Sequence, residues 1–216
     1  MLPTISRDAL ESFLLLLPVL VLSMTLHEIA HGYVAWRLGD PTSKMLGRLS
    51  PNPLRHVDPL GTAMFAITWF GSGGSFIFGW AKPIPVQPRF FNHPQRGMAL
   101  VALAGPAVNF VIALLLAAFL VHGPELTGIA QQVVVGAFLV NIVLGVFNLL
   151  PIPPLDGSRI LGVIMPREMY ERWSDLDRYG MIILLGLFFL LQKPFFEILN
   201  TLTTGVTDIL FRIVGG

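Results

Sequence analysis

The sequence contains no cysteine and few charged residues. Without cysteine in 216 residues, disulfide bonds and thiolate ligands are excluded, so a bound metal would need imidazole, carboxylate or amide ligands. Charged residues make up 12% of the chain and hydrophobic residues 54%, whereas a soluble domain has about 25% charged residues. This composition predicts an integral membrane protein that forms a single domain over residues 1–216, with the lipid bilayer as its main partner.

Features of nucleic-acid binding and of a cleaved leader are also missing. The formal net charge is only +1, and the chain has neither a basic stripe nor a nucleic-acid-reading motif, so no nucleic-acid partner is expected. The apolar stretch 13–26 follows a segment of mixed charge and precedes no small-residue cleavage site. We therefore expect this stretch to be retained as a membrane helix and not removed as a signal peptide.

Long apolar segments predict the architecture. Three of them could cross a hydrocarbon core of about 30 Å at about 1.5 Å per residue, namely residues 12–36, 97–121 and 133–150. A further apolar helix begins near residue 180 and is interrupted at Lys193-Pro194. Apolar residues at i, i+3, i+4 and i+7 predict an amphipathic helix over about 195–214. We expect an all-α polytopic membrane protein, a bundle of about four to six transmembrane helices with its core in residues 12–160.

Residues 57–81 permit two interpretations. They are apolar but contain Gly71-Ser-Gly-Gly74, and both flanks are basic. The positive-inside rule then puts both ends on the cytoplasmic side, which fits two crossings or a re-entrant hairpin. A small membrane-associated hairpin or sheet is expected here, with a short strand near 46–49 in the polar loop before it. The proline-rich segment 82–88 is predicted to be extended.

The first apolar segment carries His27-Glu28-Ile-Ala-His31. On a helix, residues four apart lie on one face, so H-E-x-x-H offers two imidazoles to zinc and a carboxylate to a water molecule. Two packing histidines beside a solvated glutamate would be the alternative. That alternative is weaker inside a bilayer, where each ionisable side chain costs about 3 kcal/mol or more.

A catalytic zinc site needs a third protein ligand. The loop 37–56 is basic and the loop 122–132 has no lysine or arginine, so the first span runs inward and the third returns to the same side. The third span ends in a proline-rich segment before Asp156, which makes Asp156 the predicted third ligand. Taken alone, Asp156 would be an ordinary turn residue. Asp58, in the cytoplasmic-side hairpin, is the alternative ligand.

At this point the chain resembles the site-2 protease family of intramembrane zinc metalloproteases. His27-Glu28-Ile-Ala-His31 matches the family's zinc-helix motif. Asn148-Leu-Leu-Pro-Ile-Pro-Pro-Leu-Asp156-Gly157 matches its N-x-x-P-x-P-x-L-D-G motif at every fixed position, and Ala104-Gly-Pro-Ala-Val-Asn109 resembles its G-P-x-x-N element. The resemblance covers about residues 20–160 and is closest to compact bacterial and archaeal forms without a PDZ or CBS domain.

The resemblance implies a function and a site. His27, His31 and Asp156 would bind one zinc ion per chain, and Glu28 would act as the general base. Asn148 is a candidate for binding the substrate backbone or the oxyanion, or else an interhelical hydrogen-bonding residue. The expected substrates are transmembrane proteins or peptides. The expected location is a prokaryotic plasma membrane, with the active site toward the cytoplasm.

The sequence leaves three alternative functions open: a catalytically silent zinc-binding scaffold of the family, a metal transporter, or a membrane metalloprotease with a glutamate as third ligand. We expect Asn109 to be structural. The remaining histidines lack ligand-like spacing and are expected to be ordinary solvated residues: His56, His93 and His122. An unwound substrate strand could pair with the edge of segment 57–81 or 82–88.

Overall fold

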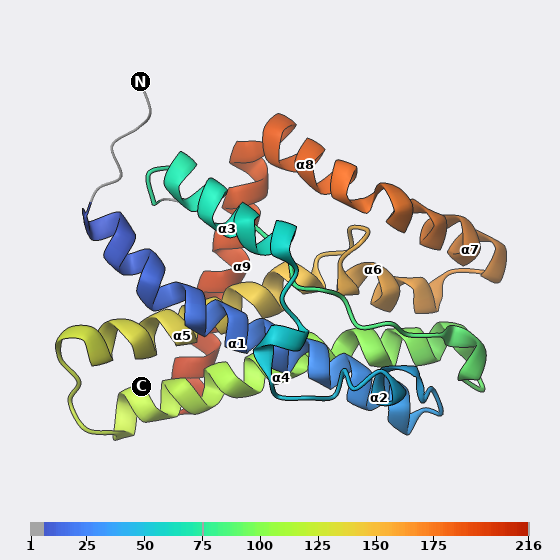
Figure 1. Cartoon of the computed structure of the whole chain (residues 1–216), viewed down its shortest axis with the longest axis horizontal. Coiled ribbons are helices and arrows are strands. Elements are labelled where there is room, and N and C mark those ends of the chain that lie inside the picture. The colour runs from blue at the N-terminus through green and yellow to red at the C-terminus, as the bar shows by residue number, and fades with distance from the viewer. Residues whose placement is uncertain (1–6, 75, 216) are drawn as a thin grey trace.

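The computed structural model of the protein describes residues 7–74 and 76–215. Within these residues the chain forms helices and no strand, which confirms the all-α class. The chain order is apparent in Figure 1. The α-helices are α1 (Arg7–Arg37), α2 (Thr42–Met45), α3 (Pro59–Gly71), α4 (Pro94–His122), α5 (Gly128–Leu149), α6 (Asp156–Leu161), α7 (Arg167–Asp175), α8 (Gly180–Leu190) and α9 (Gln192–Ile213).

Three helices are long and apolar enough to cross a membrane, namely α1, α4 and α5. A fourth span is counted if the bent unit from Arg167 to Ile213 crosses as one, so the described chain lies at the lower limit of the expected four to six. Each of these three helices packs against the other two. Large apolar side chains on their outer faces are exposed, including Leu14, Leu115 and Leu139, as suits helices that face lipid.

Small residues let the long helices approach closely. Ala113 and Ala117 of α4 are completely buried against Phe138, Ile142 and Val146 of α5. Such pairing of small with large side chains is typical of membrane helix interfaces, where packing has to replace the hydrophobic driving force. The polar residues that the site requires are therefore held in a rigid three-helix frame.

Segment 57–81 forms a helix with an extended return. Helix α3 has 13 residues, or about 20 Å at 1.5 Å per residue, which is short of a crossing. The hydroxyl of Thr68 accepts from the amide of Phe78 at 2.8 Å, and the amide of Lys82 donates to the carbonyl of His56 at 2.7 Å. Because α3 is too short to cross and this last bond brings the two ends of the segment together, the structure favours the re-entrant interpretation.

The short strand predicted near residues 46–49 is wrong. Pro41 instead starts the helical turn α2, and the amide of Arg48 closes this turn by donating to the carbonyl of Ser43 at 2.8 Å. The buried guanidinium of Arg48 then donates to the carbonyls of Arg55 and Lys82, each at 2.6 Å. A buried arginine thus satisfies backbone carbonyls from two loops at the point where they meet.

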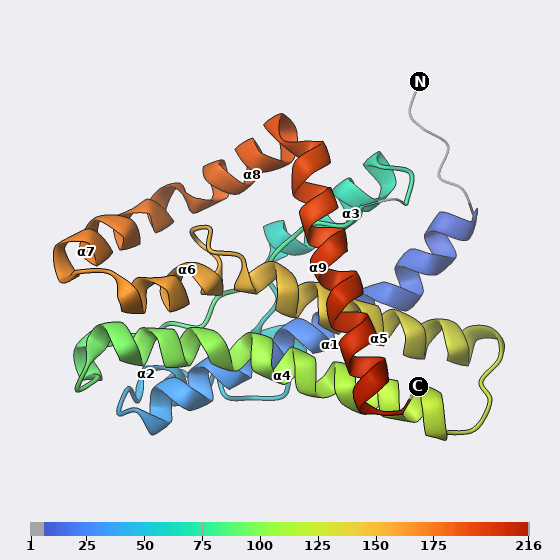
Figure 2. The ribbon, with the colours of Figure 1, turned by 180° about the vertical axis from the view of Figure 1, so that it is seen from behind.

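The C-terminal amphipathic helix is confirmed, and α9 begins at Gln192 with Pro194 in its first turn. Prolines are tolerated there because the first amides of a helix have no internal partner. Helix α9 bends by 98° from the unit before it and contacts α4 and α5, whose ribbons it crosses in Figure 2. Phe195 and Leu210 are buried, whereas Ile198 and Ile209 of the same apolar stripe remain exposed.

Candidate metal centre

The two histidines of the first motif lie on the buried face of α1. Their rings lie one helical turn apart in an edge-to-face arrangement, with centroids 4.5 Å from each other and ring planes at 85°. The Nε2 atoms of His27 and His31 lie 3.2 and 3.3 Å from Oδ2 of Asp156. One ligand atom from each of the three residues lies within 4.8 Å of the other two. The structure thus brings together the three side chains that the sequence predicted as ligands.

Asp156 reaches this position because the chain reverses sharply after α5. The proline-rich connection leads directly into α6, of which Asp156 is the first residue. A Cβ atom at Gly157 would lie 2.1 Å from the carbonyl oxygen of Leu149, closer than atoms can approach. Only glycine therefore allows α6 to pack against the end of α5. Gly157 acts through this close approach of α6 to the end of α5.

A chain of buried amides fixes the protonation of His27. The side-chain amide nitrogen of Asn141 donates to the carbonyl of Ala137 at 2.8 Å and to the hydroxyl of Ser23 at 3.0 Å. Since that carbonyl can only accept, the Asn141 oxygen must face Asn109, which donates to it at 2.9 Å. The Asn109 oxygen then faces Nδ1 of His27 at 2.6 Å. The hydrogen of the neutral His27 ring is therefore on Nδ1.

His31 has the same arrangement with a simpler partner. Its Nδ1 lies 2.7 Å from the backbone carbonyl of Val101, which can only accept a hydrogen bond. Both imidazoles consequently point an Nε2 lone pair at Asp156 when neutral. A ligating histidine commonly donates its other N–H in this way, which fixes ring orientation and raises ligand basicity.

Asp156 completes a set of acceptors that is suited to a cation. Burial raises its pKa, but the facing His31 and His27, when they are protonated, lower it by more, to about 2. Its Oδ2 is buried and makes no hydrogen bond among the described residues. A buried acceptor without a donor is costly. Two imidazole nitrogens and one carboxylate oxygen match the ligands that zinc prefers, so the residues fit the metal.

Gly105 of α4 faces the ring nitrogens of His27 and His31. A Cβ atom at this position would lie 2.5 Å from Nε2 of His31 and 2.6 Å from Nε2 of His27. Any side chain at residue 105 would therefore occupy the space in front of the two ring nitrogens. The motif Gly-Pro-x-x-Asn thus supplies two functions from one helix face: Gly105 leaves room for the metal, and Asn109 orients His27.

Glu28 lines a cavity of about 350 Å³ together with the three candidate ligands. One of its carboxylate oxygens accepts a hydrogen bond from the amide of Ile84 at 2.8 Å, so the extended segment after α3 fixes its position. Asn148 lies on the wall of the same cavity, and its side-chain nitrogen also donates to the carbonyl of Leu144 at 2.9 Å. The cavity therefore holds the candidate base, the candidate ligands and the candidate oxyanion donor together.

Two other residues have different roles from those expected. Asp58, the alternative third ligand, caps α3 by accepting from the amide of Gly61 at 2.8 Å. It does not belong to the metal-ligand cluster found among the described residues. His56 was expected to be solvated and is instead 2% exposed, with Nε2 lying 2.9 Å from the carbonyl of Ser50. That prediction was wrong because the loop folds over α1 and α3, which no local pattern indicates.

Sequence reasoning missed Asn109 as part of the site. It is completely buried, links α1 to α5 through Asn141, and contacts a candidate ligand directly. The available signal was its position four residues after Gly105 within one motif. On a helix that spacing puts Asn109 on the same face as a glycine that leaves room for a neighbouring helix.

Fold and site together define a helical membrane protein with a candidate histidine–carboxylate metal site at the junction of α1, α4 and α6. The model of peptidase family M50 matches residues 15–127 and 123–191. The chain belongs to this family, the family of the site-2 proteases, and neither match is to a PDZ or CBS domain.

Several relatives carry names that describe zinc metalloproteases. YwhC of Bacillus subtilis, named as a candidate zinc metalloprotease, is 41% identical over 178 residues, which cover 78% of this chain and 77% of the relative. Rip2 of Mycolicibacterium smegmatis, named likewise, is 31% identical over 194 residues, or 86% and 71% of the two chains. The zinc metalloprotease MJ0392 of Methanocaldococcus jannaschii is 27% identical over 69% of this chain and 34% of its own length. No solved structure matches the chain significantly.

Proposed function

We propose that this chain is a zinc endopeptidase that hydrolyses peptide bonds of transmembrane segments within the membrane. The observation that carries this proposal is the convergence of His27, His31 and Asp156 beside Glu28, inside a helical membrane bundle. Relatives named as zinc metalloproteases support both the metal and the reaction type. The proposed substrates are single transmembrane helices, the class of peptide that a membrane-embedded cavity can reach.

His27, His31 and Asp156 would hold one zinc ion per chain through two Nε2 atoms and a carboxylate oxygen. A zinc ion with three protein ligands keeps a position open for water or substrate, polarises a carbonyl and lowers the pKa of water to about 7. Asn109 and the Val101 carbonyl hold the two rings with their lone pairs directed to this point. The site is thus oriented by buried groups from α4.

Glu28 is the proposed general base. It follows His27 directly, lines the cavity, and uses Oε2 for the amide of Ile84. Its other oxygen makes no hydrogen bond among the described residues and is available to a water molecule. Glu28 would take a proton from the attacking water and later deliver it to the leaving amine, a role that typically contributes 10² to 10⁴ in rate.

Asn148 is the proposed donor to the oxyanion. An amide nitrogen has two hydrogens, and the bond to Leu144 uses one of them. The second can donate to the oxygen of the carbonyl under attack, where a fixed donor stabilises charge only as the charge develops. Asn148 and Glu28 line the same cavity and would then act on the same peptide bond.

The extended segment after α3 is the proposed partner of the unwound substrate. The carbonyl of Pro85 accepts from Ser43 and the amide of Gln87 donates to Asp40, so these two positions face the loop after α1. Backbone groups alternate along an extended chain. The amide of Val86 therefore lies on the other edge, toward the cavity, and makes no hydrogen bond among the described residues. A substrate strand could pair there.

Charge asymmetry supports the proposed orientation in a prokaryotic plasma membrane. Lysines and arginines concentrate before and after segment 57–81 and in residues 159–178, while residues 123–132 have none. Cytoplasmic loops carry such an excess. Ten residues separate His27 from Arg37, or about 15 Å along α1, so the site would lie below the cytoplasmic surface and be reached by water from that side.

Two other functions fit less well. A metal transporter would need several ligand clusters along a path, and only one cluster of three metal-binding side chains occurs in the residues that the structure describes. A catalytically silent scaffold would not need Glu28, yet this carboxylate is held in the cavity beside the candidate ligands. Both observations favour the peptidase.

The test compares zinc content and cleavage of a transmembrane peptide in the wild type and in Glu28→Ala. Glu28→Ala should retain one zinc per chain and lose cleavage by at least 100-fold, because the ligands remain and the proton acceptor is gone. A purified wild type that binds no metal, or a Glu28→Ala variant that cleaves at the normal rate, would refute the proposal.

A further inference from the structure

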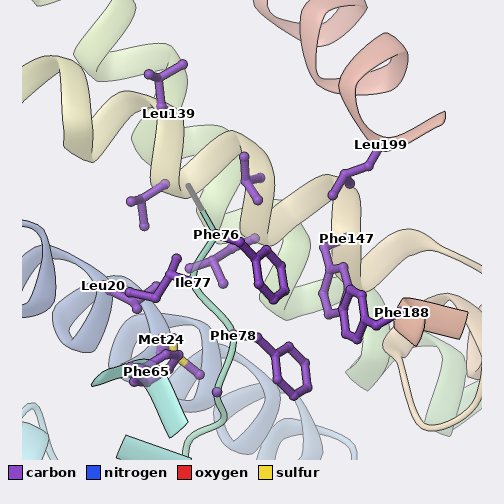
Figure 3. Close-up of a pocket in the computed structure, with 14 residues that line it drawn as sticks. Leu20, Met24, Phe65, Phe76, Ile77, Phe78, Leu139, Phe147, Phe188 and Leu199 are labelled. Atoms are coloured by element: carbon purple, nitrogen blue, oxygen red, sulfur yellow. The ribbon is translucent and has the colours of Figure 1, made fainter. Parts of the chain in front are cut away.

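A second cavity, of about 230 Å³, lies nearer than the metal cavity to the N-terminal ends of α1 and α5. Each of its lining residues is apolar, and they come from α1, α3, the extended return after α3, α5, α8 and α9. Figure 3 shows the rings of Phe76, Phe78, Phe147 and Phe188 around one space, with Met24 of α1 nearby. The proposed reaction does not use this cavity.

The apolar cavity and the metal cavity share the same faces of α1 and α5. On α1, Leu20 and Met24 line the apolar cavity, and Glu28 continues the i, i+4, i+8 series into the metal cavity. On α5, Leu144 lines the apolar cavity and Asn148, four residues on, lines the other. Residues at this spacing lie one above another on a helix, so the two cavities follow each other along one groove.

The extended segment also runs along both cavities. Residues 76–79 line the apolar cavity, and Pro83, Ile84 and Val86 line the metal cavity. A peptide that pairs with the exposed edge near Val86 is therefore directed along the segment toward the aromatic cavity. Leu20 and Met24 lie eight and four residues before Glu28, or about 12 and 6 Å along the helix. An extended peptide covers this distance in about two to four residues at 3.3 Å each.

The apolar cavity opens toward the lipid-facing surface. Its floor is buried, with Phe65 4% and Phe188 8% exposed, whereas Leu139 and Val143 of α5 are 49% and 41% exposed at its rim. A side chain can thus enter from the bilayer side. The volume is below the range of about 300–1,000 Å³ that is usual for a whole small ligand, and it suits a single large side chain.

We propose that this cavity is a specificity pocket for the peptidase reaction. It takes a leucine- or phenylalanine-like side chain of the transmembrane substrate, two to four residues from the scissile bond on the side that stays embedded in the bilayer. This inference rests on the proposed function, because it assumes that a peptide occupies the metal cavity. A lipid acyl chain is the competing occupant, and the experiment separates the two.

The experiment uses the zinc-loaded chain in vesicles and a set of transmembrane peptides, each with one leucine changed to alanine at a defined distance from the cut. Val143→Phe and Leu139→Phe each fill the pocket from its rim. Val111→Phe is the matched control, since Val111 of α4 is 56% exposed and does not line the pocket. Binding of the same peptides to Glu28→Gln is measured in parallel, because this change removes the base and keeps the pocket.

One of the alanine-substituted peptides, with alanine two to four residues from the cut, should be a poorer substrate of the wild type and of Val111→Phe. Its kcat/KM and affinity should be about 10-fold lower than those of the leucine peptide, the usual effect of an unfilled apolar pocket. In Val143→Phe and Leu139→Phe this difference should shrink to less than 3-fold, with zinc content unchanged. The loss of discrimination at a single substrate position is the diagnostic result.

Two outcomes would overturn the inference while leaving the proposed function intact. One is cleavage without preference at any position, and the other is equal discrimination in the pocket-filled variants. A uniform loss of activity on every peptide in these variants, with unchanged discrimination, would assign the pocket to a lipid chain. Failure of zinc-loaded wild type to bind or cleave any of the peptides would refute the proposed function and the pocket's role together.

Discussion

At the scale of single residues, the site depends on which groups donate hydrogen bonds and which accept them. The carbonyl of Ala137 sets the orientation of the Asn141 amide, and Asn141 sets that of Asn109. The Asn109 oxygen then requires that the hydrogen of the neutral His27 ring is on Nδ1. Such buried networks are worth most when every member is satisfied. Asn109 is therefore a positioning residue for the candidate metal ligand, although it is not expected to contact zinc itself.

Replacing Asn109 tests this role. Asn109→Leu should lower zinc affinity by about 10- to 100-fold, because His27 loses the acceptor that fixes its orientation. Asn109→Asp keeps an acceptor oxygen toward Nδ1 and should recover most of the affinity. The measurement is a competition titration against a chelator of known zinc affinity, with the exposed Asn200→Leu as control. Wild-type affinity in Asn109→Leu would show that the network serves only packing.

The residues of the metal centre were largely predictable from the sequence, whereas their supports were not. The spacing of His27, Glu28 and His31 specifies a helix face, and the charge of the loops places Asp156 on the same side of the membrane. Asn109 could not be assigned because a single asparagine within a membrane helix is as consistent with packing as with orienting a ligand. Its partner is 82 positions away, and no local pattern indicates such a distance.

At the scale of elements, the extended segment after α3 is proposed to pair with the substrate backbone, although its prolines leave few amide donors. Prolines at 83, 85 and 88 prevent a helix and also remove three amide donors. Of the remaining amides, those of Lys82, Ile84 and Gln87 are bonded to the loops or to Glu28. The amide of Val86 is thus the donor that this edge can offer to a substrate.

Val86→Pro should remove that donor. We expect kcat/KM for several transmembrane peptides to fall by about 3- to 10-fold, since one hydrogen bond contributes about 0.5–1.5 kcal/mol, with zinc content unchanged. Val86→Ala keeps the amide and should stay near the wild-type value. Ile84→Pro, which removes the partner of Glu28, should have a larger effect. Unchanged cleavage by Val86→Pro would argue against strand pairing at this edge.

The elements differed in how well the sequence specified them. Long apolar runs define the membrane helices because length alone must match the bilayer. The prediction of a strand near residues 46–49 was wrong because the buried Arg48 organises that loop by binding the carbonyls of Arg55 and Lys82. Local sequence does not indicate such tertiary contacts. The sequence did not decide whether residues 57–81 make two crossings or a re-entrant hairpin, because both arrangements leave the two basic flanks on the cytoplasmic side. The length of α3, only 13 residues, favours the re-entrant form.

At the scale of the whole molecule, the candidate ligands join segments that are remote in sequence. His27 and His31 belong to α1 and Asp156 to α6, while α4 packs between them through Gly105. A metal bound here would stabilise the folded bundle, because binding to the native state alone adds to its stability. The three long helices and the metal centre would then unfold together.

Metal removal tests this coupling. At a free zinc concentration 1,000 times Kd, binding adds about 4 kcal/mol, and each kcal/mol shifts Tm by about 2–4 °C for a chain of this size. Stripping zinc with a chelator should therefore lower Tm by about 10 °C in detergent or vesicles. His27→Ala, which lacks a ligand, should show little dependence of Tm on zinc. An equal shift in this variant would mean that zinc acts elsewhere.

The membrane class followed from composition, because a chain with 12% charged residues cannot cover a soluble surface. The all-α class followed from apolar segments long enough to cross a membrane as helices. The single-domain boundary over residues 1–216 stays a prediction. The relative placement of the two cavities could not be predicted. It depends on which faces of α1 and α5 meet, and hydrophobic periodicity is weak in helices that are apolar on all sides.

The alternating prolines of the extended segment also bear on turnover. A strand that pairs with a fully equipped edge gains several backbone hydrogen bonds and dissociates slowly. Among the described residues this edge provides one free donor, at Val86. A cleaved fragment is therefore held weakly by its backbone once its continuity across the active site is lost. Release of the two products should then be fast relative to bond cleavage, and fragments of the cleaved helix should be poor inhibitors.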